Sequence, residues 1–309
     1  MDYSIIIPVY NEEKNIIELY SRLKPVLRQL KKKYEIIFVD DGSTDNTYKE
    51  LEKLHNKDKT VKIIKFRKNF GQTAAWDAGF KHALGKYIIT IDGDLQNDPN
   101  DIPKLIKKLK EGYDVVSGWR VKRKDALSKK LFSVFSRQLR KLIINDKIHD
   151  SGCSLKIYKK DCFKDLDLHG EMHRYITEIL ALRGFKIGEV KVNHLPRKKG
   201  KTKYNLVRLP KGFLDLMVVA FWQRYSSRPI HLFGGLGIIM SFFGVLTGLY
   251  LLYLKFFYKA AIANRPLLLL AILLVVLGIQ FIIFGLIADI LIRMYYLGDK
   301  KNYHIEKIK

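Results

Sequence analysis

The chain has 309 residues, of which 48% are apolar, and it carries a formal net charge of +25 at pH 7. That apolar content suffices for one large or two ordinary domains, so a disordered chain is excluded. The positive charge requires an anionic partner, which can be nucleic acid, an acidic lipid surface or a phosphorylated substrate. Only two cysteines occur, without the spacing of a zinc site, so buried thiols in a reducing compartment are expected.

Strand and helix patterns alternate along the N-terminal part of the chain. Met1 and Asp2 lead directly into the first strand, so no signal peptide is expected and this part should stay in the cytosol. Strands are expected at 4–8, 34–39, 61–66, 87–91, 114–118 and 186–192, with a short one after 155, and helices at about 14–32, 45–55, 73–84, 101–111 and 172–183. The alternation predicts an α/β fold with a mostly parallel sheet, covered by helices on both faces and joined by right-handed crossovers.

The strand at 87–91 leads directly into acidic residues. It has no charge and is rich in β-branched residues, which is typical of a strand covered on both faces. Ligands of parallel sheets lie beyond the carboxyl ends of the strands, where Asp92, Asp94 and Gln96 follow. Two carboxylates one residue apart offer the oxygen ligands that Mg²⁺ or Mn²⁺ prefers on a nucleotide diphosphate. The alternative is that Asp92 and Asp94 only form a turn around Gly93 and cap the next helix.

Polar residues also follow the first two predicted strands. Tyr10, Asn11 and Glu12 come after the first strand, which Pro8 ends, and Asp41 comes after the second. Because these strand ends meet at one edge of the sheet, Glu12 and Asp41 are expected to contact a nucleotide, Asp41 by accepting a hydrogen bond from its base or ribose. Helix capping is the alternative for both residues.

Two basic segments lie in the second half of the chain. Residues 127–144 predict an amphipathic helix with lysine and arginine between its apolar residues, which can lie in a membrane interface. An ordinary surface helix is the alternative. Residues 194–204 form a basic loop that is expected to grip phosphate as a lid. No RNA- or DNA-binding motif accompanies the charge, so nucleic acid is not an expected partner.

Two long apolar segments, 232–254 and 266–290, are expected to cross a membrane as a hairpin. Each is close to the ~20 residues that span a ~30 Å hydrocarbon core, and the short connection between them puts both outer ends on one side. By the positive-inside rule the flanking basic residues place that side in the cytosol, although basic residues at the tip weaken the bias. The flanking residues are Arg224, Arg228, Arg293, Lys300 and Lys301, and those at the tip are Lys255, Lys259 and Arg265.

The sequence thus divides into three parts. A cytosolic domain with juxtamembrane helices covers 1–229, a transmembrane hairpin covers 230–294, and a cytosolic tail covers 295–309. We therefore expect a multi-pass protein of the plasma (inner) membrane, with the main domain and both termini in the cytosol. Membrane lipids and phosphorylated ligands then account for the positive charge.

Five motifs occur in order along the chain. They are Ile7-Pro8-Val9-Tyr10-Asn11-Glu12, Asp40-Asp41-Gly42-Ser43-Thr44-Asp45, Asn69-Phe70-Gly71-Gln72, Asp92-Gly93-Asp94-Leu95-Gln96 and Ser117-Gly118-Trp119-Arg120. Together they resemble the family 2 glycosyltransferases of the GT-A fold, specifically the polyprenyl-phosphate hexosyltransferases similar to dolichol-phosphate mannose synthase and to GtrB- or ArnC-like enzymes. Residues 170–176, residues 197–204 and the hairpin extend the resemblance to nearly the whole chain.

The resemblance implies a Rossmann-like GT-A domain that carries out metal-dependent, inverting transfer of one sugar. The donor would be a UDP- or GDP-linked sugar, and the acceptor undecaprenyl or dolichyl phosphate. A homo-oligomer, by analogy a tetramer, is also implied. The resemblance fixes neither the sugar nor the nucleotide base.

The resemblance also assigns roles to individual residues. The nucleotide-sugar would be bound by Pro8, Tyr10, Asn11, Glu12, Asp40, Asp41, Gly71, Gln72 and Asp92. Mg²⁺ or Mn²⁺ would be held by Asp92, Asp94 and Gln96. The acceptor phosphate would be bound by Arg120, Lys129, Lys130, Ser133, Arg197 and Lys203, and the catalytic residues would be Asp94, Arg120 and Asp150. Lys129 and Lys130 depart from relatives that have an arginine there, and Thr202 stands where serine is usual.

The chemistry of the implied reaction limits what Asp150 must do. A lipid phosphate monoester is already an oxyanion at neutral pH, so it can attack an anomeric carbon without a strong general base. The site must instead position and stabilise two phosphate groups, and Asp150 can orient rather than deprotonate. Two other functions stay open: a processive polysaccharide synthase, whose Gln-x-x-Arg-Trp signature the sequence lacks, and a non-catalytic membrane scaffold or lipid-carrier protein that keeps the fold.

Overall fold

A computed structural model describes residues 1–121, 148–196 except 151, 165, 169 and 171, and then 221, 225, 228–259, 261–262 and 265–297. The chain forms two compact units, Met1–Leu216 and Met217–Lys309. Each unit is described separately below. The predicted helix at 127–144 and, of the predicted lid at 194–204, the part from Arg197 to Tyr204 lie outside the described residues.

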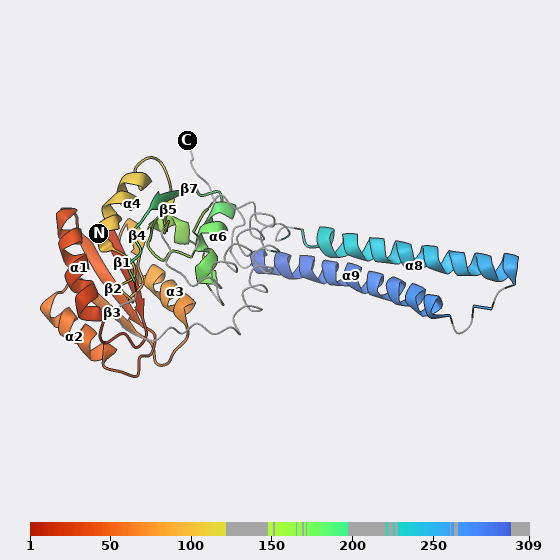
Figure 1. Ribbon diagram of the computed structural model, residues 1–309, viewed down its shortest axis with the longest axis horizontal. Helices are drawn as coiled ribbons and strands as arrows, with labels where there is room; N and C mark the ends of the chain where they lie inside the picture. The colour runs from red at the N-terminus through yellow and green to blue at the C-terminus, as the bar shows by residue number, and fades with distance from the viewer. Residues whose placement is uncertain are drawn as a thin grey trace. The chain divides into compact units, whose positions relative to one another are not determined.

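The first unit is built on a seven-stranded sheet of order β3-β2-β1-β4-β6-β5-β7 (Figure 1). The strands are β1 Tyr3–Val9, β2 Tyr34–Asp40, β3 Val61–Lys65, β4 Tyr87–Thr90, β5 Val115–Trp119, β6 Lys156–Lys159 and β7 Ile187–Lys191. Only β6 runs antiparallel to its neighbours, β4 and β5, and the other described pairs are parallel. The predicted mostly parallel α/β sheet is confirmed.

Helices cover both faces of this sheet, because the central strands are apolar on both sides. Ile5 and Ile7 of β1 pack into one core with α1, α2 and α4, whereas Ile6 packs into a second core with α3 and α6. The helices are α1 Ile16–Gln29, α2 Thr47–Lys57, α3 Gln72–His82, α4 Ile102–Leu109 and α6 Ile176–Leu182, with short 3₁₀ helices η1 Pro99–Asp101, η2 Lys160–Phe163 and η3 Met172–Tyr175. Consecutive strand residues point to opposite faces, so such strands need two helical layers.

Both cysteines are buried in this unit, as expected. Cys153 belongs to the first core and Cys162 to the second, and neither is in a disulfide. Burial raises the pKa of Cys153 to about 11 and that of Cys162 to about 12. These thiols therefore stay protonated at neutral pH.

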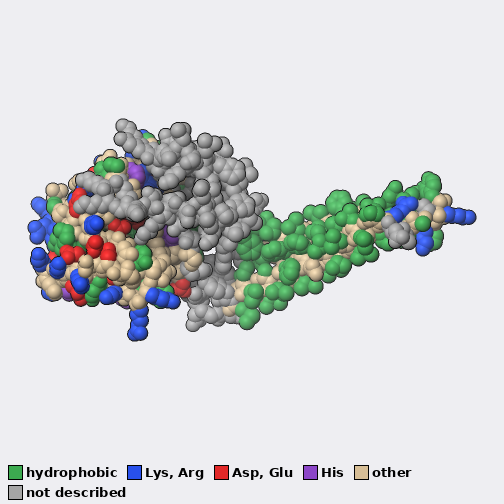
Figure 2. Space-filling model, turned by 60° about the horizontal axis from the view of Figure 1, so that its bottom comes forward, with side chains coloured by type: hydrophobic (Ala, Val, Ile, Leu, Met, Phe, Trp, Pro, Cys, Tyr) green, Lys and Arg blue, Asp and Glu red, His purple; other side chains and the backbone are tan. Residues whose placement is uncertain are grey.

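The described part of the second unit contains two long helices, α8 Ile230–Tyr258 and α9 Pro266–Leu297. Both predicted apolar segments lie within them, and both helices are long and apolar enough to cross a membrane. Most of their side chains are exposed, and hydrophobic side chains make up most of the visible surface of the pair in Figure 2. A core helix of a soluble protein would bury such side chains, so the exposed apolar surface favours a lipid environment.

Glycine contacts show that α8 and α9 pack closely and antiparallel. A Cβ atom at Gly244 would lie 2.9 Å from the carbonyl oxygen of Ala271, and one at Gly237 would lie 2.4 Å from that of Gly278. Later residues of α8 thus meet earlier residues of α9. Small residues let the two backbones approach, as in other membrane helix pairs.

Replacing Gly278 with isoleucine is expected to separate these helices. A Cβ atom there would lie 2.2 Å from Ser241 Oγ and 2.6 Å from the carbonyl oxygen of Gly237. Such overpacking costs about 1–3 kcal/mol, so the thermal unfolding midpoint in detergent should fall. Gly248→Ile is the matched control, because a Cβ atom at Gly248 meets nothing within 4 Å. Equal midpoints for the two variants would contradict the described packing.

Candidate active site

The candidate site lies at the edge of the sheet where β1, β2, β4, β5 and β7 end. Because β6 is antiparallel, its first residue, Lys156, pairs with Thr90 near the end of β4 and with Ser117 of β5. The segments that follow β1, β2 and β4 therefore meet the segment that precedes β6. This brings together residues that are far apart in the sequence.

The loop after β1 is tied to the loop after β2. The backbone N–H of Asn11 donates to Ser43 Oγ at 3.0 Å, and Asn11 Oδ1 accepts from the N–H of Thr44 at 2.9 Å. The N–H of Glu12 donates to Thr47 Oγ1 at 2.8 Å, and its carboxylate accepts from Asn15 Nδ2 at 2.5 Å. Asn11 and Glu12 thus hold the loop after β1 against the loop after β2, at the edge of the site.

Asp41 organises the loop that precedes α3. Its buried carboxylate accepts from the N–H of Phe70 at 2.7 Å and from the N–H of Gly71 at 3.0 Å. Burial raises the pKa of Asp41, and these two N–H groups oppose that rise. The carboxylate does not cap α2, whose first N–H is bound by Asp45 at 2.9 Å. The side chain therefore holds Gly71, and with it Gln72, at the site edge.

Asp92 and Asp94 lie on the loop that follows β4. A Cβ atom at Gly93 would come within 2.9 Å of Val9 Cγ1, so only glycine lets this loop pack against β1. Asp92 Oδ1 accepts from Gln72 Nε2 at 3.0 Å, and Asp94 Oδ1 accepts from the N–H of Gln96 at 3.1 Å. The acidic loop is thus joined to the segment that Asp41 holds.

The turn-and-cap alternative accounts for part of this loop only. Asp94 does make a turn contact, but the residue that caps the following η1 helix is Asp98, which accepts from the N–H of Asn100 at 3.0 Å. Asp92 makes neither contact. Its carboxylate instead accepts a hydrogen bond from the side chain of Gln72.

The charges around Asp92 fit a cation. Burial and the charge of Asp94 raise the pKa of Asp92 to about 6, and the Ser154 hydroxyl and Arg120 oppose this rise. Two mutually repelling carboxylates form a donor pair suited to Mg²⁺ or Mn²⁺. The described contact of the Gln96 side chain, the third predicted ligand, is with His194, whose Nε2 lies 3.5 Å from Gln96 Nε2. Within the described residues there is no group of three Asp, Glu, His or Cys side chains that could hold a metal alone. Substrate oxygens would have to complete the coordination.

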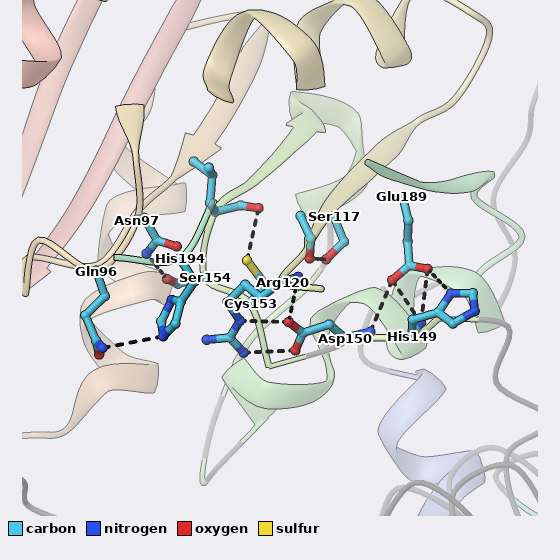
Figure 3. Close-up of polar contacts among 12 residues, drawn as sticks. Gln96, Asn97, Ser117, Arg120, His149, Asp150, Cys153, Ser154, Glu189 and His194 are labelled. Carbon is cyan, nitrogen blue, oxygen red and sulfur yellow. Dashed lines mark hydrogen bonds and ion pairs between the residues drawn. The ribbon is translucent and has the colours of Figure 1, made fainter. Parts of the chain in front are cut away.

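Arg120 and Asp150 form a buried, two-pronged ion pair. Arg120 Nε donates to Asp150 Oδ2 at 2.7 Å and Arg120 Nη2 donates to Oδ1 at 2.9 Å, while the backbone N–H of Arg120 also donates to Oδ2 at 3.2 Å (Figure 3). Only 11% of the arginine side chain and 9% of the aspartate side chain are exposed. Burial opposes the charge of Arg120, but Asp150 outweighs that effect and raises the pKa of the guanidinium. Asp150 therefore fixes the direction of Arg120.

Three residues beside the site were not singled out by the sequence analysis. His194 Nε2 lies 3.5 Å from Gln96 Nε2, and Ser154 Oγ accepts from Asn97 Nδ2 at 2.7 Å (Figure 3). Glu189, on β7, binds the backbone just before Asp150. Glu189 could have been singled out from the sequence, because it is the only acidic residue inside the strand predicted at 186–192.

The family pattern of "Glycosyl transferase family 2" matches residues 4–167 of this chain. The chain belongs to glycosyltransferase family 2. The match covers all five motifs and most of the sheet, and it shows that this protein is a glycosyltransferase.

Two curated relatives cover almost the whole of this family 2 glycosyltransferase. It is similar to a dodecaprenyl-phosphate galacturonate synthase of Rhizobium johnstonii, with 38% identity over 100% of this chain and 93% of the relative. It is also similar to an undecaprenyl-phosphate 4-deoxy-4-formamido-L-arabinose transferase of Proteus mirabilis, with 32% identity over 99% of this chain and 93% of the relative.

A solved structure supports the GT-A fold of this glycosyltransferase. The glucosyl-3-phosphoglycerate synthase of Mycobacterium tuberculosis, in complex with Mn²⁺ and uridine-diphosphate-glucose, is similar with a TM-score of 0.54. The likeness covers 71% of this chain and 78% of that chain at 16% identity. Identity this low shows the fold alone.

The glycosyltransferase brings most of its predicted site residues to one edge of the sheet. The residues found there are Pro8, Tyr10, Asn11, Glu12, Asp40, Asp41, Gly71, Gln72, Asp92, Asp94, Gln96, Arg120 and Asp150. The predicted acceptor-binding residues Lys129, Lys130, Ser133, Arg197 and Lys203 lie outside the described residues. Their roles stay predictions.

Proposed function

We propose that this glycosyltransferase transfers one sugar from a UDP- or GDP-linked donor to a polyprenyl phosphate, undecaprenyl or dolichyl, with inversion at the anomeric carbon. The observation that carries the proposal is the meeting of an acidic pair and a buried arginine at one edge of the sheet. Asp92 lies within reach of the charges of both Asp94 and Arg120. The names of the two curated relatives support the class of acceptor.

The donor would lie along the loops that Asp41 and Asn11 hold in place. Its nucleoside would meet the segment from Tyr10 to Glu12 and the segment at Gly71, and its diphosphate would reach the acidic loop. Mg²⁺ or Mn²⁺ held by Asp92, Asp94 and Gln96 would neutralise charge on the leaving nucleoside diphosphate. These assignments rest on the contacts described above and on the resemblance of the motifs.

The transfer itself is a single displacement. A phosphate oxygen of the lipid forms a bond to the anomeric carbon while the bond from that carbon to the nucleoside diphosphate oxygen breaks. Arg120 supplies a fixed positive charge for the phosphate oxygens, and Asp150 holds the guanidinium in place. No proton has to be removed from the attacking phosphate at neutral pH, so Asp150 acts as an orienting group.

The enzyme would work on the cytosolic leaflet of the plasma (inner) membrane. Both α8 and α9 can span a membrane, and basic residues flank the outer ends of the hairpin in the sequence. Under this arrangement the catalytic domain and both termini lie in the cytosol. The predicted helix at 127–144 would lie in the membrane interface and the predicted lid at 194–204 would grip phosphate; the helix and the part of the lid from Arg197 on lie outside the described residues.

A transfer assay tests the proposal directly. The full chain, reconstituted in membranes, is incubated with Mg²⁺ or Mn²⁺, undecaprenyl or dolichyl phosphate, and a panel of UDP- and GDP-sugars. The expected product is a lipid phosphate carrying one sugar. Long polymers would indicate a processive synthase, and the absence of product with every donor would contradict the proposed donors and acceptor.

We also propose that the enzyme forms a homo-oligomer through α9. Gln280 is exposed on this helix, about 21 Å along the axis from Pro266 and about 18 Å from Ile292 at 1.5 Å per residue. Its amide cannot reach either surface of the bilayer, and lipid chains offer no hydrogen bond. The same glutamine of a second copy offers both a donor and an acceptor.

Gln280→Leu is therefore expected to weaken self-association. Chemical cross-linking of the protein in vesicles should show fewer oligomers than the parent chain, because a leucine makes no interhelical hydrogen bond. Ile279→Leu is the matched control, since Ile279 is also exposed on α9. An unchanged oligomer distribution for Gln280→Leu would contradict this interface.

A further inference from the structure

The chain leaves the sheet after Trp119 and returns at the same place before β6. Trp119 and His149 stack with ring centroids 4.3 Å apart, and Arg120 is paired with Asp150. These contacts bring together the two ends of the segment that contains 122–147. Closing a loop of this length has an entropic cost, which the paired ends offset.

Glu189, on the neighbouring strand β7, holds the returning end of this segment. Its Oε1 accepts from the N–H of His149 at 2.9 Å and from the N–H of Asp150 at 3.2 Å. Its Oε2 lies 2.8 Å from Nδ1 of the His149 ring (Figure 3). Glu189 reaches residues 149 and 150 because β5 and β7 pair in parallel. In this pairing Glu189 lies opposite Ser117, three residues before Arg120.

We propose that Glu189 is a positioning residue that sets the direction of Arg120 through Asp150. The carboxylate fixes the backbone of residues 149–150, that backbone places the Asp150 carboxylate, and Asp150 holds two nitrogens of the Arg120 guanidinium at 2.7 and 2.9 Å. The proposal rests on the proposed function, in which Arg120 stabilises phosphate oxygens.

The reach of Glu189 is separable from its charge. Glutamine keeps the length of the side chain and one oxygen for the two backbone N–H groups, but it loses the charge. Aspartate keeps the charge but is one methylene shorter, so its oxygens withdraw from residues 149 and 150. A positioning role requires reach, whereas a role as a counter-charge requires the carboxylate.

Kinetics of Glu189→Gln and Glu189→Asp test the proposal. We expect Glu189→Gln to keep kcat within about threefold of the parent enzyme and Glu189→Asp to lower kcat by about tenfold or more, because small misplacements at a site cost up to about 10²-fold. The donor KM should stay within about twofold for both, because Asp41 and Asn11 hold the donor loops. Lys191→Met is the control on the same strand, with its ammonium 5.6 Å from the Trp119 ring centroid, and it should leave kcat unchanged.

Fluorescence of Trp119 gives a readout that needs no substrate. The chain has three tryptophans, so Trp76→Phe with Trp222→Phe leaves Trp119 as the only indole. A stacked imidazole quenches indole emission, so Glu189→Asp should raise the emission of Trp119 and Glu189→Gln should not.

Several outcomes would overturn the inference. The inference fails if kcat is parental in both variants, if both lose kcat equally, or if Glu189→Gln loses more. Each result would show that the length of the Glu189 side chain does not set the activity. Unchanged Trp119 emission in Glu189→Asp would also contradict it. A parent enzyme without transfer activity on any donor would instead count against the proposed function, while the emission of Trp119 would still test whether Glu189 holds residues 149 and 150.

Discussion

Asp94→Ala is expected to abolish metal-dependent sugar transfer and to leave the fold intact. Asp94 is a member of the acidic pair, and its described contact is one turn hydrogen bond to the N–H of Gln96 at 3.1 Å. Loss of a carboxylate ligand removes charge stabilisation of the leaving diphosphate, so kcat should fall by about 10³-fold or more. The lipid-linked sugar product measures activity, and titration with Mn²⁺ followed by electron paramagnetic resonance measures metal binding.

An acid outside the site provides the control for this variant. Asp161 is exposed at the far end of β6, in the η2 helix, and Asp161→Ala should keep parental activity and Mn²⁺ binding. Circular dichroism and the thermal unfolding midpoint should match the parent for both variants. Ordinary turnover by Asp94→Ala would show that the metal assignment is wrong.

Asp150→Ala is expected to be both inactive and unstable. Only 11% of the Arg120 side chain is exposed, so removing its partner leaves a buried charge without compensation. Breaking a buried ion pair in this way costs about 3–5 kcal/mol. The thermal unfolding midpoint should therefore fall together with kcat.

The double variant Arg120→Met with Asp150→Leu separates stability from catalysis. Two apolar side chains of similar size carry no buried charge, so the unfolding midpoint should return most of the way to the parental value. Transfer should stay absent because the positive charge at the site is gone. A double variant that transfers sugar, or an Asp150→Ala protein of parental stability, would refute the roles given to this pair.

Much of the fold could be predicted because its signals are local. Apolar, β-branched runs marked the strands, and apolar residues three or four positions apart marked helices such as α1 and α4. The direction of β6 could not be predicted from its sequence. Lys156 to Lys159 is a four-residue strand, and its orientation depends on the path of the chain after β5 rather than on its own residues.

The candidate site was predictable where chemistry-bearing residues directly follow a strand. Asp41 and Asp92 are of this kind, since the end of a parallel strand fixes the edge on which they lie. The partners of these residues were not predictable. Arg120 and Asp150 are 30 residues apart, and Glu189 meets residues 149 and 150 only because β7 pairs with β5. Such contacts are set by tertiary pairing, which periodicity does not encode.

The buried thiols have a practical consequence for labelling experiments. Cys153 and Cys162 are the only cysteines of the chain, and both are shielded and protonated at neutral pH. Maleimides react with exposed thiolates, so the unmodified enzyme should remain almost unlabelled. A cysteine introduced at the hairpin tip or beside the acidic loop would then carry the probe by itself, and membrane topology could be mapped without first removing the native pair.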